Sequence, residues 1–234
     1  MNYLQLCQLV ARRAGIAGAS AGMPADVTGQ PERLQLACDF VADAVADIET
    51  AYLDWSFMRS SIDFFIEGGT EWLDPSETHG DLLSINEAAV YGRNERLEQQ
   101  IWPMPWPELR RRRETTMSLI EVESIPTHFA VDQSGIIQFY PVAKNAYTLR
   151  AEYVLAPSVM AAATDKPRIP DTHSRAIVWR ALALYHERDE ADLLMQRAEG
   201  RFAEWMSRME AAFLPDNAWT RTHSPEVPMV MRTE

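Results

Sequence analysis

The sequence predicts an α+β protein: a mainly α-helical bundle of N-terminal and C-terminal helix pairs, with an inserted antiparallel β-rich subdomain and an extended C-terminal tail. Three observations lead to this prediction. Apolar residues recur at helical spacing near both ends, they alternate with polar residues in the middle, and the last residues follow neither period. The helix pairs can pack together only if the chain returns to its start, so the β-rich region is expected to be an insertion. The predicted divisions are 1–58, 59–158, 159–215 and 216–234.

The first predicted helix pair lies near the N-terminus. Residues 2–14 repeat apolar side chains at helical spacing, and residues 15–29 are rich in Gly, Ala and Ser, which indicates a loop. A longer helix is expected to begin near Pro31, because proline suits the first helical position, and to end around Asp54 or Trp55. Its predicted apolar stripe contains Leu34, Ala37, Cys38, Val41, Ala44, Val45, Ile48 and Tyr52.

The middle of the chain changes to a period of two. Ile62, Phe64 and Ile66 alternate with polar residues, and turn residues 67–70 precede residues 71–73, which predicts a β-hairpin. Further strands are expected at residues 82–91, 127–131, 135–140 and 147–155.

Residues 101–107, IWPMPWP, form the most unusual segment of this middle region. Three prolines remove donors from a strand ladder, so the segment is expected to be extended or polyproline-like and not a central strand. Trp102 and Trp106 are therefore candidate anchors for a neighbouring subunit or a tail component, the alternative being that they fold back on their own domain.

A short helix is expected at residues 108–114, directly after this segment. It carries the one basic run of the chain, Arg110 to Arg113. Four consecutive arginines circle a helix and cannot all face one way, and nearby glutamates dilute their field. We interpret Arg110 and Arg113 as part of an exposed or intersubunit face, with a nucleic-acid site as the alternative.

The second helix pair follows a linker at residues 160–170. Asp171 is expected to cap a helix that carries Ile177, Val178, Ala181, Leu184 and Tyr185. After a turn near residues 188–189, a long helix is expected to run to Pro215, with a stripe of Met195, Ala198, Phe202, Met206, Met209 and Phe213. The tail after Pro215 has scattered apolar residues, including Trp219, and no period, so we expect a partner to order it.

Composition excludes several classes of function. The formal net charge is -12 and the sequence pI is about 4.9, which argues against duplex DNA binding and against attachment to anionic membranes. No stretch reaches the apolar length of a membrane span, and residues 1–10 do not resemble a signal peptide. Cys7 and Cys38 are expected to be buried thiols, a single bridge between them being the alternative.

A search for catalytic and metal-binding motifs returns negative results. The spacing of the five histidines fits no zinc motif, and the chain lacks GxSxG, GxxxxGK[ST] and GxGxxG. Asp39, Asp43 and Asp47 line one helix face, which we interpret as a solvated face; a cation site and a negative wall that keeps DNA from adhering are the alternatives. We therefore expect no enzymatic activity, no cofactor and no metal.

Several stretches together resemble a known family. The opening MNYLQLCQLVARRAGI, the Gly/Ala-rich loop with VTGQ, and the long helix through AVADIETAYLDWSFMR look like the start of SU10-type head-to-tail adaptors of short-tailed bacteriophages. The stretch IPDTHSRAIVWRALALYHERDEADLLMQRAEGRFAEWMSRMEAAFLP is similar to the C-terminal helices of that family, and the β-rich middle agrees in position and length.

The resemblance implies a virion protein made in the host cytoplasm. It implies a homo-oligomeric ring, dodecameric in this family, that docks under the portal protein, extends the DNA channel without specific binding of the double-stranded DNA, and carries tail nozzle or fibre proteins. The C-terminal segment would reach the portal, with contacts from Phe213, Trp219, Arg221, Met229, Met231 and Arg232. A different virion part, such as a nozzle or tail-completion protein, and a hydrolase with paired carboxylates are the alternatives.

Overall fold

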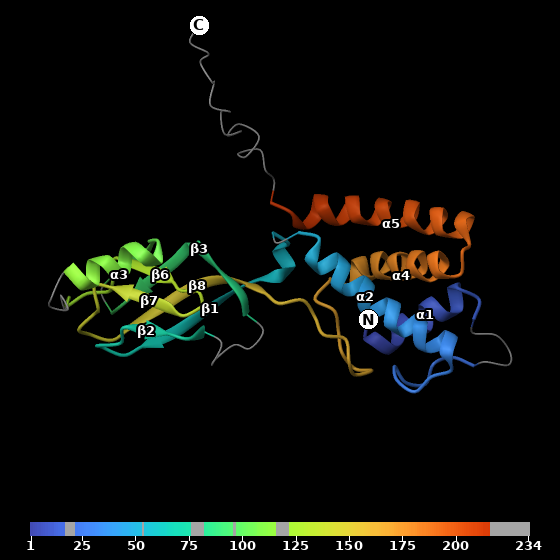
Figure 1. Cartoon of the computed structure of the whole chain (residues 1–234), viewed down its shortest axis with the longest axis horizontal. Helices are drawn as coiled ribbons and strands as arrows, with labels where there is room; N and C mark the ends of the chain where they lie inside the picture. Colours follow the sequence, from blue (N-terminus) through green and yellow to red (C-terminus); the bar gives the residue numbers. More distant parts are fainter. Residues whose placement is uncertain (17–21, 53, 76–81, 96, 116–121, 216–234) are drawn as a thin grey trace, which may run out of the picture. The chain divides into compact units, whose positions relative to one another are not determined.

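The computed structural model describes residues 1–16, 22–52, 54–75, 82–95, 97–115 and 122–215 (Figure 1). It divides into a helical unit, Met1–Phe57 with Pro157–Glu234, and a β unit, Met58–Ala156. Helices make up the described part of the first unit, and strands dominate the second. The α+β class predicted from the sequence is therefore confirmed.

The helical unit is built by four α-helices within its described residues. They are α1 (Tyr3–Arg13), α2 (Glu32–Thr50), α4 (Ser174–Arg188) and α5 (Asp192–Phe213). The helix α1 packs against α2 and α4, α2 also packs against α4, and α4 packs against α5 (Figure 1). Apolar side chains at helical spacing form the core, and they include Leu6, Val10, Val41, Ile48 and Ile177, all 0% exposed.

The end of α2 differs from the prediction. The helix ends at Thr50, and Tyr52, which was expected on the buried stripe, is 40% exposed and donates its hydroxyl hydrogen bond to Glu210 at 2.9 Å. Trp55 is fully buried, and its indole N–H donates to the Ile48 carbonyl at 2.9 Å. The tryptophan thus gives the Ile48 carbonyl at the helix end a second donor, besides the Ala51 N–H at 3.3 Å.

The predicted cap of α4 is also wrong. Asp171 begins a 3₁₀ turn, Asp171–His173, and α4 starts at Ser174. The Asp171 carboxylate pairs with the amino group of Met1, whereas its carbonyl accepts a hydrogen bond from the Ser174 hydroxyl at 2.9 Å. The tight turn places the aspartate one turn too early to cap the α-helix itself.

Within its described residues, the β unit contains two four-stranded sheets and one α-helix, α3 (Trp106–Thr115). The first sheet has the order β1-β8-β3-β4, with β1 (Arg59–Ile66), β8 (Tyr147–Leu155), β3 (Leu82–Arg93) and β4 (Glu98–Gln100). The second has the order β2-β7-β6-β5, with β2 (Trp72–Leu73), β7 (Ile137–Tyr140), β6 (His128–Val131) and β5 (Trp102–Pro103).

The predicted hairpin of residues 62–66 and 71–73 does not form. The strand β1 pairs antiparallel with β8 along its whole length, so that Ile62 lies opposite Ala151 and Phe64 opposite Leu149. The short strand β2 pairs with β7 in the other sheet. Glycine explains the change of sheet: the Gly69 N–H donates to the Ala143 carbonyl at 2.8 Å, and a Cβ on Gly68 would overlap the Lys144 carbonyl oxygen. The turn therefore packs on residues 143–145 instead of folding back.

The core of the β unit is formed by inward-facing side chains of both sheets. Strand β8 alternates buried and more exposed residues over Tyr147–Tyr153, as its sequence predicts. The prediction for the proline-rich segment agrees with the structure, because β5 is a two-residue edge strand parallel to β6. Its remaining donors are satisfied: the Trp102 N–H donates to the Thr127 carbonyl at 3.0 Å, and the Met104 N–H to Phe129 at 2.8 Å.

Candidate interaction surfaces

The two tryptophans of the proline-rich segment have different surroundings. The Trp102 side chain is on the edge strand and is 56% exposed. Trp106, at the start of α3, is partly buried against a small cluster of Met104, Leu109 and Ala130. Trp102 therefore remains available as a contact residue, whereas Trp106 packs on its own domain.

The arginines of α3 are largely paired inside the β unit. Arg110 forms an exposed ion pair with Glu114 at 3.1 Å, and Arg112 does so with Glu108 at 2.9 Å. The Arg113 side chain is 21% exposed and donates to the Gln138 side chain and the Phe139 carbonyl, each at 2.8 Å. Arg113 thus fastens α3 to β7, and Arg110 keeps an outward position.

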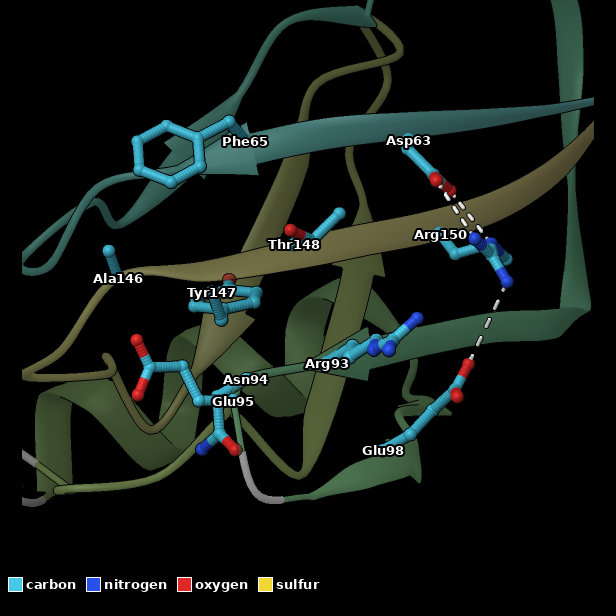
Figure 2. A pocket seen from close by; sticks show the side chains of 10 residues that line it. All are labelled: Asp63, Phe65, Arg93, Asn94, Glu95, Glu98, Ala146, Tyr147, Thr148 and Arg150. Atoms are coloured by element: carbon cyan, nitrogen blue, oxygen red, sulfur yellow. Dashed lines mark hydrogen bonds and ion pairs between the residues drawn. The ribbon is translucent and has the colours of Figure 1, made fainter.

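A pocket of about 440 Å³ lies on the outer face of the first sheet (Figure 2). At one side of its lining, Arg150 donates to both carboxylate oxygens of Asp63, at 2.8 and 2.9 Å, and lies 4.0 Å from Glu98 (Figure 2). The Arg150 hydrogen bond holds the pKa of Asp63 below its usual range. Arg150 therefore joins Asp63 and Glu98 in one ion-pair network on this face. Phe65, which also lines this pocket, is 72% exposed and is an apolar contact point on the same face.

A buried carboxylate and two buried thiols of the helical unit have structural roles. Glu49 is 3% exposed, and its carboxylate accepts from the Ser158 N–H at 2.6 Å, the Ser158 hydroxyl at 3.1 Å and the Arg168 N–H at 2.9 Å. Cys7 and Cys38 are both buried free thiols, and their mutual hydrogen bond together with burial raises the pKa of Cys7. Among the described residues no group of histidines, cysteines and carboxylates could hold a metal ion.

A second pocket, of about 450 Å³, lies on the helical unit between α1, α4 and α5. It is lined by five arginines, two tryptophans and one glutamate: Arg13, Arg175, Arg197, Arg201, Arg208, Trp179, Trp205 and Glu204. The Arg13 guanidinium lies 4.9 Å from the centre of the Trp179 ring, and Arg208 lies 5.0 Å from Trp205. We call this the Arg–Trp pocket.

Sequence analysis missed the Arg–Trp pocket, although the sequence carries a signal for it. The arginines of the pocket are not consecutive, unlike the basic run Arg110 to Arg113. On α5, however, Arg197, Arg201, Trp205 and Arg208 are spaced four, four and three residues apart, and Arg175 and Trp179 repeat this spacing on α4. Such spacings put side chains on one helix face, so a search at helical period would have found both stripes.

The predicted portal contacts lie almost entirely outside the described residues. Trp219, Arg221, Met229, Met231 and Arg232 belong to residues 216–234, which the structure does not describe. Phe213 is the exception: it ends α5, is partly buried, and packs edge-on against Phe57 at 5.4 Å and His173 at 5.0 Å between ring centres. Phe213 therefore anchors the last helix where the tail begins.

Comparison with known proteins gives the family. No helix in the described part of the chain is long and apolar enough to cross a membrane. A search of curated proteins found no match. The family model described as SU10 adaptor protein matches residues 1–229, which include both helical ends and the β unit. The chain therefore belongs to the SU10 adaptor protein family, a family of structural phage adaptors of the virion neck.

Proposed function

We propose that this chain docks as a ring of twelve subunits beneath the portal protein, where it extends the DNA channel and carries the tail nozzle or fibre proteins. The observation that supports this most is the family match over residues 1–229, because it includes both folded units and the tail as far as residue 229. Within this proposal the protein assembles in the host cytoplasm and has no turnover. DNA passes through the lumen without specific binding, as suits a chain of net charge -12.

The proposal gives the parts of the chain different partners. The two helical parts, residues 1–58 and 159–215, form the body of each subunit. The tail, residues 216–234, reaches the portal from the end of α5, with Trp219 as its principal apolar anchor. The β insertion, residues 59–158, contacts a neighbouring subunit or the next tail component, and the exposed Trp102 and Arg110 support this role.

The test uses the full chain and the portal protein of the same phage, observed by electron microscopy and by a binding titration. We expect rings on the portal, and Trp219→Ala should weaken portal binding by about tenfold or more, as loss of an anchor residue does. Trp72→Ala is the matched control, because Trp72 is a 54% exposed tryptophan of the β unit and should leave portal binding unchanged. Binding to an isolated nozzle protein, with no ring on the portal, would replace the proposal with a nozzle or tail-completion role.

A further inference from the structure

The Arg–Trp pocket carries positive charge that its own chain does not neutralise. Five of its residues are arginines, and the single carboxylate among the lining residues, Glu204, pairs with Arg201 at 2.9 Å. Within the described part of the chain, the other four arginines of the pocket have no carboxylate within ion-pair distance. Five of the twenty arginines of this acidic chain thus lie together, and four of the five are open to an anion.

The burial and the like charges of the pocket arginines favour an anionic ligand. Burial, and then the positive charge of Arg175, lower the pKa of Arg13. Like charges this close repel one another, and a bound anion would replace the repulsion with attraction. Guanidinium groups match carboxylates in a two-point geometry, and the flat Trp179 and Trp205 rings beneath them hold the arginines in place.

Carboxylates fit this surface better than the phosphates of a DNA duplex. A duplex requires a basic field much wider than one pocket. The end of α4, the turn and the start of α5 instead carry Glu187, Asp189, Glu190 and Asp192 beside Arg188, so the positive charge of the pocket does not continue through this end of the helix pair. The observations therefore favour a short acidic surface of a protein.

The helical unit itself presents such a surface on α2. Asp39, Asp43 and Asp47 are exposed and follow one another at four-residue intervals. This interval corresponds to about 6 Å along a helix, and Arg197 and Arg201 on α5 have the same interval. The carboxylates of one helix can therefore match the arginines of another in register.

The acidic stripe and the Arg–Trp pocket lie on different flanks of the α4–α5 pair. Asp47 accepts a hydrogen bond from Arg180 at 2.7 Å, and the Arg180 guanidinium lies over the Phe202 ring. The adjacent residues Trp179 and Arg201 line the pocket instead. Neighbouring residues of a helix point about 100° apart, so one subunit cannot bring its own stripe into its own pocket.

We propose that the Arg–Trp pocket of one copy binds the Asp39–Asp43–Asp47 stripe on α2 of a second copy. This contact joins unlike faces, and contacts of that kind close into rings when the rotation between copies allows it. The inference rests on the proposed ring and deepens it, because it names the surfaces through which neighbouring subunits meet.

Carbodiimide coupling of the full chain tests the contact directly. This reagent joins an amine to a carboxylate in contact with it. Arg201→Lys keeps the charge and introduces an amine into the pocket, while Lys144 and Lys166, the two lysines of the chain, give the background. In a mixture of isotopically light and heavy copies, we expect mixed-label cross-links from position 201 to Asp39 or Asp43. In 0.5 M salt their yield should fall about tenfold.

Charge reversal gives a second test that does not depend on a lysine. We expect Arg175→Glu with Arg208→Glu, and separately Asp39→Arg with Asp43→Arg, each to abolish self-association and ring formation on the portal. A mixture of these two variants should recover association, because the intact pocket binds the intact stripe and the reversed pocket again faces a stripe of opposite charge. Thermal unfolding by circular dichroism checks that each variant is folded.

Several outcomes would overturn the inference. They are mixed-label cross-links from position 201 to other carboxylates or no mixed-label cross-links at all, self-association unchanged by either pair of reversals, or duplex DNA binding that the pocket reversal removes; coupling to Glu204 within one copy is expected in any case. Rings on the portal that survive both reversals would refute this contact and leave the proposed function standing. Cross-links from position 201 to Asp39 or Asp43 without portal binding would support this contact and refute the proposed function.

Discussion

Arginines are used differently in the two units of this protein. In the β unit, Arg113 donates to Gln138 and Phe139 at 2.8 Å, and Arg150 holds both oxygens of Asp63. In the helical unit, Arg13 and Arg208 lie over tryptophan rings and line an open pocket. Arg113 and Arg150 thus hold parts of the β unit together, whereas Arg13 and Arg208 of the helical unit remain available for a partner.

This difference separates stability from assembly. Hydrogen-bonded groups that are taken out of water destabilise a fold when their partners are lost, whereas exposed charges without partners contribute little to it. Substitutions in the β unit should therefore change unfolding, and substitutions in the Arg–Trp pocket should change association alone.

The largest expected effect is on the stability of the helical unit. This unit also contains a buried carboxylate, that of Glu49, so stability does not depend on the β unit alone. Glu49→Ala removes the acceptor for the Ser158 and Arg168 N–H groups, and we expect it to lower the free energy of unfolding by about 3 kcal/mol. Chemical denaturation measures the effect. Glu49→Gln, which keeps one acceptor oxygen, should lose about half as much. Glu199→Ala on the exposed face of α5 is the control, and an equal loss there would refute the role of Glu49.

A smaller effect compares the two kinds of arginine directly. Arg113→Ala leaves acceptors on β7 without their donor, so it should cost about 2 kcal/mol and speed amide hydrogen exchange in Ile137–Tyr140. Arg208→Ala removes one cation–π contact but also relieves repulsion, so it should change the free energy of unfolding by less than about 0.5 kcal/mol. If the two variants were equally destabilised, the contrast between the units would be lost.

The sequence predicted which face of a helix or strand is buried much better than it predicted which element lies next to it. The apolar stripe of α2 from Leu34 to Ile48 and the alternation of β8 follow from local periods, which the fold preserves. The pairing of β1 was mispredicted because a period of two defines the buried face of a strand and not its neighbour. The contact of Gly68 and Gly69 with residues 143–145, more than 70 positions away, decided that neighbour.

The candidate sites were also harder to predict where contacts between distant segments matter. Trp102 was identifiable because prolines leave its segment few ways to bury a tryptophan, and it is exposed. Trp106 looked equivalent in the sequence, yet the cluster of Met104, Leu109 and Ala130 receives it. The Arg–Trp pocket needs α1, α4 and α5 together, and no single stretch of sequence contains more than part of it. Packing between distant segments therefore decides which side chains remain exposed.

The smallest expected effect sharpens the comparison within the β unit by using a histidine as a probe. Burial, followed by the nearby Arg112 charge, lowers the pKa of His128, with Glu108 acting in the opposite direction. Arg112→Ala removes the positive charge and frees Glu108 from its ion pair at 2.9 Å, so both changes should raise the pKa of His128. His186 is the internal control: burial also lowers its pKa, but Asp189 is the charge that acts on it. In an NMR titration the His128 resonances should therefore move to a higher midpoint while those of His186 stay in place. A shift of both midpoints would mean that the substitution acts through general unfolding, and a shift of neither would mean that the α3 arginines do not act on the sheet beneath them.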